Sequence, residues 1–186
     1  MKEIIKSFLI ESARIKTELA ADDSFIENFD KAADSLKKTV VNGGTIYACG
    51  NGGSACDAMH FTEELVARYK RDREGIKAMH FMDPGTLTCW ANDYDFQTVY
   101  GRQAKTFCNA NDCLIAISTS GNSKNIIQAI ENAKAKGTTT ILLTGKGGGK
   151  AKSIADISII VPSDETDRIQ EAHICIIHAL CEFLET

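Results

Sequence analysis

The sequence predicts an α/β fold: a doubly wound three-layer sandwich with a five-stranded parallel sheet in flavodoxin-like order, plus two N-terminal helices. Short apolar runs typical of buried strands alternate with amphipathic helical patterns along the chain. Parallel strands need crossover connections, and these are right-handed and cover both faces of the sheet with helices. The two most distinctive loops follow the first and third runs, at strand ends where such folds bind ligands.

Two helices are expected before the first strand, because apolar residues recur at helical spacing over residues 4–19 and 25–41. Asn42 and two glycines then stop the second helix. The strands are expected at residues 45–49, 76–82, 112–117, 138–143 and 157–161. Helices are expected between and after them, at residues 54–69, in two short stretches within 83–107, at 124–136, briefly after 150, and at 165–185.

The length of 186 residues is that of one compact domain, and we expect residues 1–186 to form a single domain. The chain has only two prolines, and no linker, internal repeat or low-complexity segment interrupts it. It has 21 basic and 25 acidic residues, a formal net charge of -4, which argues against nucleic-acid binding. The longest basic cluster, from Arg68 to Arg73, is interpreted as a solvated helix end.

Seven cysteines occur, an odd number, and no pair has the C-x2-C spacing of a zinc knuckle. They are interpreted as small buried apolar residues in a reducing compartment rather than as disulfides or thiolate metal ligands. Charged residues interrupt the apolar N-terminus, so no signal-peptide core is present, and no apolar run has the length of a membrane span. The protein is therefore expected to be cytoplasmic, with no membrane partner.

The first distinctive loop, Cys-Gly-Asn-Gly-Gly-Ser at residues 49–54, resembles an anion cradle. Its glycines let backbone N–H groups approach a phosphate, and the following helix directs its positive end at the same place. The second loop, residues 118–123, offers four hydroxyls, from Ser118, Thr119, Ser120 and Ser123, before another helix. Helix caps and tight turns use the same residues. Two such loops at neighbouring strand ends favour a phosphate site.

Two other glycine patterns are weaker. The first loop also matches the G-x-G-x-x-A dinucleotide pattern, but the nearest suitable acid, Asp83, lies too far along the chain. Residues 145–150 resemble a P-loop only superficially, because the G-x4-G-K-[ST] spacing is missing, and they are interpreted as a mobile surface turn.

Candidate chemical groups lie on the helix after the first loop and on the last helix. His60 and Glu64 are four residues apart and share a helix face, where they can ligate a metal or share a proton. His173 and His178 diverge by about 140° around the last helix, so only one of them can face a given site. A histidine among apolar residues is usually a hydrogen-bonded core residue, and His80 is interpreted in that way. The presence of Glu64 and two phosphate-type loops favours a functional role for His60 and His178.

These motifs together resemble the sugar isomerase (SIS) domain family, and within it the phosphoheptose isomerases. The resemblance runs nearly end to end, through residues 50–65, 91–93, 117–123, 143–145 and 168–173. The two loops carry the likeness to the domain family, whereas His60, Glu64, Gln170 and His178 carry the likeness to the isomerases.

The resemblance implies a homotetramer that converts sedoheptulose 7-phosphate to D-glycero-D-manno-heptose 7-phosphate, a precursor of bacterial surface polysaccharides such as lipopolysaccharide. It implies Glu64 and His178 as catalytic residues, and one zinc ion per subunit held by His60, Glu64, Gln170 and His178. Substrate contacts are implied for residues of both loops and four others: Asn51, Gly52, Gly53, Ser54, Glu64, Asn92, Asp93, Ser118, Thr119, Ser120, Ser123 and Gln170.

Some alternatives remain open at this stage. A helix rises about 12 Å between Gln170 and His178, so these side chains must lean together or belong to different subunits. The residues do not decide which of Glu64 and His178 is the base. A non-catalytic phosphosugar-binding regulator or adaptor, and an isomerase of another phosphosugar, would share the loops. A dinucleotide oxidoreductase is a more distant alternative.

Overall fold

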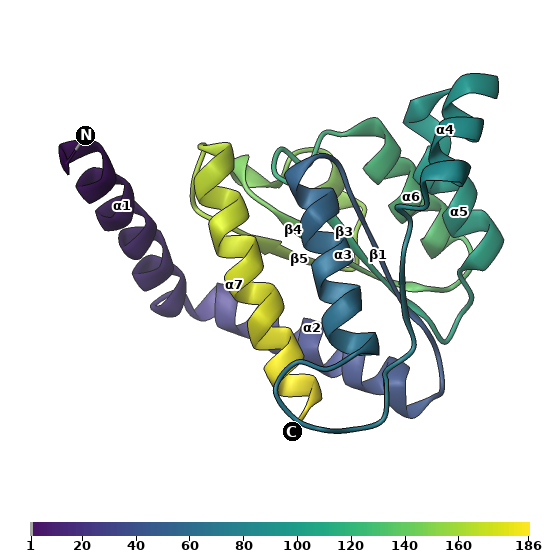
Figure 1. Cartoon of the computed structure of the whole chain (residues 1–186), viewed down its shortest axis with the longest axis horizontal. Helices are drawn as coiled ribbons and strands as arrows, with labels where there is room; N and C mark the ends of the chain where they lie inside the picture. The colour runs from purple at the N-terminus through teal and green to yellow at the C-terminus, as the bar shows by residue number, and fades with distance from the viewer. Residues whose placement is uncertain (1) are drawn as a thin grey trace.

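A computed structural model describes residues 2–186 and confirms the predicted architecture (Figure 1). All five strands are parallel, in the flavodoxin-like order β2-β1-β3-β4-β5. The strands are β1 (Ile46–Gly50), β2 (Ala78–His80), β3 (Cys113–Ser118), β4 (Thr139–Thr144) and β5 (Ile157–Ile160). The helices are α1 (Lys2–Ala20), α2 (Asp23–Val41), α3 (Gly53–Val66), α4 (Pro84–Asp93), α5 (Val99–Phe107), α6 (Lys124–Lys134) and α7 (Thr166–Leu184), with 3-10 turns η1 (Phe96–Thr98), η2 (Lys146–Gly148) and η3 (Ala151–Ser153).

The sheet separates two hydrophobic cores, because alternate residues of each central strand point to opposite faces. In β1, Ile46 and Ala48 pack with α1, α2, α3 and α7, whereas Tyr47 and Cys49 pack with α5 and α6. All residues of β1 and β3 are buried, as expected for parallel strands covered on both sides.

Helices α3 and α7 lie side by side on one face of the sheet, and α5 and α6 cover the other (Figure 1). Helix α1 projects from the body, attached mainly at its C-terminal end, where Ile15 and Leu19 are buried. Within residues 2–186, no helix combines the length and the apolar character needed to cross a membrane.

The region after α3 differs from the expectation. α3 ends at Val66 rather than near 69, and β2 contains three residues rather than seven. The backbone N–H of Ile76 donates to the carbonyl of Leu65 at the end of α3, which leaves this residue outside the sheet. The interpretation of residues 68–73 as a solvated helix end was wrong for Arg73, whose side chain is 16% exposed and forms an ion pair with Glu185.

The cysteine prediction is confirmed in part. All seven cysteines are free, so none forms a disulfide. Four of them are buried, but three are exposed and are not core residues: Cys56, Cys89 and Cys175.

Candidate active site

The glycine loop after β1 and the serine loop after β3 lie at the same edge of the sheet, because β1 and β3 are paired neighbours. A reciprocal pair of side-chain amide hydrogen bonds, each 2.9 Å, joins Asn51 of the first loop to Asn125 in the first turn of α6. Gly52 has φ +57°, a left-handed conformation that glycine adopts at low cost. The two loops are thus held in a fixed relation, as the phosphate hypothesis requires.

The hydroxyls of the serine loop are directed partly at one another. Ser118 Oγ lies 3.3 Å from Ser123 Oγ, and Ser120 Oγ accepts a hydrogen bond from the backbone N–H of Asn122 at 3.2 Å. Ser118 is buried, whereas Thr119, Ser120 and Ser123 are partly exposed. In the first loop Ser54 is buried, and Gly52 and Gly53 are exposed. The exposed backbone and hydroxyl groups form an anion-compatible surface at the start of α3 and α6.

The glycine-rich segment 145–150, interpreted from the sequence as a mobile surface turn, is packed against the serine loop. The N–H of Gly145 donates to Thr119 O, and the N–H of Lys150 donates to Asn122 Oδ1. A Cβ atom added at Gly121 would lie 1.9 Å from the carbonyl oxygen of Gly148. The glycines at this contact therefore permit the backbone of residues 145–150 to pack directly against the backbone of the serine loop and support it.

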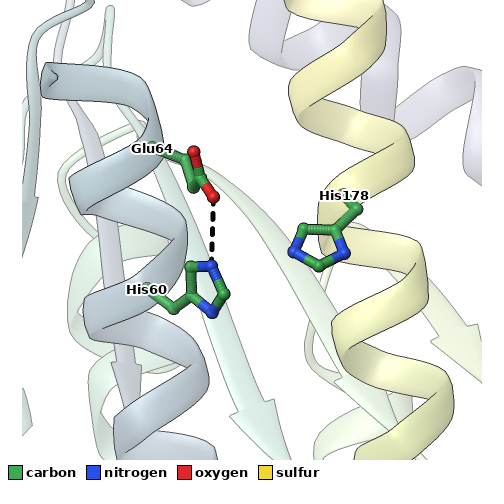
Figure 2. A group of neighbouring side chains, drawn as sticks. All are labelled: His60, Glu64 and His178. Atoms are coloured by element: carbon green, nitrogen blue, oxygen red, sulfur yellow. Dashed lines mark hydrogen bonds and ion pairs between the residues drawn. The ribbon is translucent and has the colours of Figure 1, made fainter. Parts of the chain in front are cut away.

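His60 and Glu64 of α3 face His178 of α7 (Figure 2). His60 Nε2 lies 3.1 Å from Glu64 Oε1, and one potential ligand atom from each of the three residues lies within 4.8 Å of the others. The rings of His60 and His178 are 5.2 Å apart and nearly perpendicular. The three side chains are partly buried. Two imidazoles and one carboxylate at this separation form a possible metal site and a possible acid–base pair.

Helices α3 and α7 run in the same direction, because Gly53 and Gln170 meet near their N-terminal ends whereas Glu64 and His178 meet further along both helices. Gln170 lies near the start of both helices, where its amide nitrogen is 2.5 Å from the position of a Cβ added at Gly53. His178 lies about two turns further on, beside His60 and Glu64. Within one chain, Gln170 therefore lies next to the glycine loop.

The other histidines have structural environments. His173 is buried and its Nε2–H donates to the carbonyl of Thr144 at 3.2 Å, while burial lowers the pKa of His173 to about 4. His80 Nδ1 accepts a hydrogen bond from the N–H of Met82 at the sheet edge. The predicted divergence of His173 from His178 is confirmed.

Asn92 and Asp93 lie at the end of α4, which packs mainly with α5 and η1. Asn92 Nδ2 donates to Asp93 Oδ1 at 2.8 Å, and both residues are exposed. In the described part of this single chain, the expected partners from α4 are thus directed to solvent rather than to the His60 cluster.

Three residues near the loops or the cluster were not predicted from the sequence. The ring of Tyr69 stacks on His178 at 5.7 Å, Asn125 pairs with Asn51, and Asp57 lies one turn before His60. Burial raises the pKa of Asp57 to about 6, against a smaller opposing effect of His60. Asn51 and Asn125 are 74 residues apart, and no local pattern reveals such a pair.

Comparison with known proteins agrees with this architecture. The SIS domain family model matches residues 8–145. Phosphoheptose isomerase from Tolumonas auensis is 45% identical over 185 residues, covering 99% of this chain and 96% of that protein. Its counterpart from Helicobacter pylori strain P12 is 46% identical over 183 residues, covering 98% and 94%.

The solved structure of the phosphoheptose isomerase from Neisseria gonorrhoeae superimposes with a TM-score of 0.93 at 37% identity, covering 99% of this chain and 98% of that one. The family model, the full-length sequence similarity and the fold agree. The chain belongs to the phosphoheptose isomerases of the SIS domain family.

Proposed function

We propose that this protein converts sedoheptulose 7-phosphate to D-glycero-D-manno-heptose 7-phosphate, with Glu64 and His178 as its catalytic residues. The observation that carries the proposal is the meeting of His60, Glu64 and His178 on two helices, one of which starts at the glycine loop. A non-catalytic phosphosugar-binding module needs the loops but has no use for an acid–base pair of this kind. Heptose supply for bacterial surface polysaccharides such as lipopolysaccharide is the corresponding role.

The substrate phosphate binds the serine loop through Ser118, Thr119, Ser120 and Ser123, in this proposal. Asn51, Gly52, Gly53 and Ser54 of the glycine loop contact the same substrate, as does Gln170. Helix α3 rises about 10 Å from Gly53 to His60. The His60 ring lies 3.1 Å from Glu64 of the catalytic pair, so the near edge of the cluster lies within the length of an open-chain seven-carbon sugar phosphate. The phosphate end of such a substrate can lie at the loops while its carbonyl end lies at the catalytic pair. Because the distance between the loops and the pair is fixed, it favours a heptose over a shorter sugar.

The reaction moves one hydrogen from carbon 1 to carbon 2 and the carbonyl from carbon 2 to carbon 1. One member of the Glu64–His178 pair removes the carbon-1 proton and the other exchanges protons with the two oxygens, which gives an enediol. Return of a proton to carbon 2 and loss of the proton on oxygen 1 yields the aldose, with no net change in atoms or charge. A Gln170 amide brought beside this pair, by side-chain rearrangement or from another subunit, would stabilise the developing oxyanion by donating a hydrogen bond.

The same cluster fits zinc, because two imidazoles and a carboxylate are donors of the kind that zinc binds. His60, Glu64 and His178 supply three ligands, and Gln170 is proposed as the fourth. Since Gln170 and His178 lie at different heights on α7, this ligand set requires a side-chain rearrangement or a Gln170 from another subunit. Bound zinc would polarise the sugar oxygens as a Lewis acid.

We further propose a homotetramer whose subunits complete one another's sites with Asn92 and Asp93, both exposed in the single chain. An exposed apolar stripe on α1 supports association, since five large side chains there are 44–68% exposed: Ile4, Ile5, Phe8, Leu9 and Ile10. A single domain and a cytoplasmic location are proposed as well. The seven free cysteines suit a reducing compartment.

An NMR assay of a panel of ketose phosphates, with and without chelator, tests this function. Sedoheptulose 7-phosphate is expected to be the best substrate, and treatment with chelator is expected to lower its turnover. Glu64→Gln and His178→Ala should each lower kcat by about 100-fold or more. Glu63→Gln is a matched control, because Glu63 is the exposed neighbour on α3. Near-normal turnover in both site variants, or a preference for pentose phosphates, would refute the proposal.

A further inference from the structure

An ion pair at the far ends of α3 and α7 contacts the main chain of the proposed catalytic glutamate. Arg73 Nε lies 3.1 Å from Glu185 Oε1, and the two side chains are only 16% and 1% exposed. Neither residue belongs to the His60–Glu64–His178 cluster. An exposed ion pair contributes little, whereas a buried pair is retained only when further hydrogen bonds satisfy both groups.

The Glu185 carboxylate is satisfied by the segment that follows α3. It accepts hydrogen bonds from three successive backbone N–H groups, of Tyr69, Lys70 and Arg71, at 3.3, 3.1 and 3.0 Å. Burial opposes ionisation, but these N–H groups and Arg73 outweigh it and hold the pKa of Glu185 below its usual range. An ionised carboxylate from α7 thus anchors the chain at residues 69–71.

The Arg73 guanidinium, which belongs to the segment after α3, binds the last turn of α3. Its Nη2 donates to the carbonyl of Glu64 at 3.0 Å and its Nη1 to the carbonyl of Leu65 at 2.9 Å. These are carbonyls at a helix C-terminus, which have no partner within the helix. The planar guanidinium can bind carbonyls and a carboxylate at once, and a lysine ammonium lacks this fixed fork.

Glu185 lies seven residues after His178, which places both on the same side of α7. The backbone N–H of Tyr69 donates to Glu185, and the ring of Tyr69 stacks on the imidazole of His178. One guanidinium and one carboxylate therefore connect the main chain of Glu64 to the helix and the aromatic neighbour of His178.

We propose that Arg73 and Glu185 are positioning residues that fix the spacing and orientation of Glu64 and His178. The inference rests on the proposed function of that pair. We call the Arg73–Glu185 ion pair and its main-chain hydrogen bonds the clamp. Weakening the clamp should lower kcat and the metal affinity of the cluster, because a displacement of about 1 Å can cost about 100-fold in rate. The KM for the sugar phosphate should change little, since the clamp lies at the opposite end of α3 from the loops.

The chain offers a matched control for a merely structural role. Lys70 Nζ pairs with Glu182 Oε2 at 2.5 Å and joins the same two segments, but this pair is 60% and 42% exposed. This pair is a hydrogen bond between two side chains and does not involve the main chain of Glu64. A general tether between α7 and the segment after α3 would be weakened by Glu182→Gln as well as by Glu185→Gln.

The experiment compares Arg73→Lys, Glu185→Gln and Glu182→Gln by kcat, KM, melting temperature and calorimetric titration of Zn²⁺ into the chelator-treated protein. The first two variants should lose about 10- to 100-fold in kcat and at least about 10-fold in Zn²⁺ affinity, with KM within twofold. Glu182→Gln should match the wild type. Arg73→Lys keeps the positive charge. If Glu185→Gln does not fold, the result for Arg73→Lys alone tests the inference.

Folded Arg73→Lys with wild-type kcat and Zn²⁺ affinity would overturn the inference. So would equal losses in Glu182→Gln. A wild-type protein without isomerase activity would instead refute the proposed function, and the Zn²⁺ titrations would still test the clamp.

Discussion

The contact between the serine loop and the glycine-rich segment predicts a large effect of Gly121→Ala. Gly121 has φ +60°, and an alanine there costs about 1 kcal/mol in backbone conformation alone. The new Cβ would also lie 1.9 Å from Gly148 O, whereas real Cβ contacts are essentially never below 3.0 Å. The two segments must therefore separate by at least about 1.1 Å. This movement weakens the hydrogen bond from the N–H of Ala151 to Gly121 O, now 2.9 Å.

Gly147→Ala is the matched control, because Gly147 has φ +72° but nothing within 4 Å of its added Cβ. Both variants carry the backbone cost, and only Gly121→Ala displaces the serine loop. Steady-state kinetics with sedoheptulose 7-phosphate should show a fall of about 10- to 100-fold in kcat/KM for Gly121→Ala relative to Gly147→Ala, since a displacement near 1 Å misplaces the phosphate. Values within twofold of each other would refute the role of this contact.

Three further predictions concern other parts of the chain. The unfolded chain protonates His173 near pH 6.5 and the folded chain only near pH 4, so the free energy of unfolding should fall by about 3 kcal/mol as pH drops through this window. Denaturation of His173→Gln at several pH values should show a smaller fall in the free energy of unfolding than the wild type, and an equal fall would contradict this prediction. Asn125→Asp places a carboxylate beside the proposed phosphate site, so kinetic assays should show KM raised about tenfold or more, and an unchanged KM would count against the site. Leu9→Glu charges the exposed stripe of α1, so light scattering should show dissociation of the assembly, and an intact assembly would exclude that surface as an interface.

The fold was predictable because its signals are local. Each strand is a short apolar run, each helix has its own periodicity, and right-handed crossovers leave few arrangements of such elements. The errors lie where tertiary contacts override local preference. Residues 67–77 bind the ends of α3 and α7 instead of extending helix or strand, and the partner of Arg73 is 112 residues away.

The parts of the site that were predictable are those whose residues lie on the same helix. His60 and Glu64 share a helix face by spacing alone, and the opposed orientations of His173 and His178 follow from helical geometry. Contacts between distant segments carry no such pattern, so the Tyr69–His178 stack and the support of the serine loop by residues 145–150 required coordinates.

Solvent hydrogen exchange during turnover tests the central claim most directly. The claim is that Glu64 and His178 transfer protons on a phosphate-anchored sugar. In D₂O, NMR should find deuterium at carbon 2 of the heptose 7-phosphate and at carbon 1 of recovered sedoheptulose 7-phosphate. This label should vanish in Glu64→Gln and His178→Ala and persist in Glu63→Gln. Isomerisation without deuterium in either sugar, or undiminished labelling in both site variants, would contradict the account.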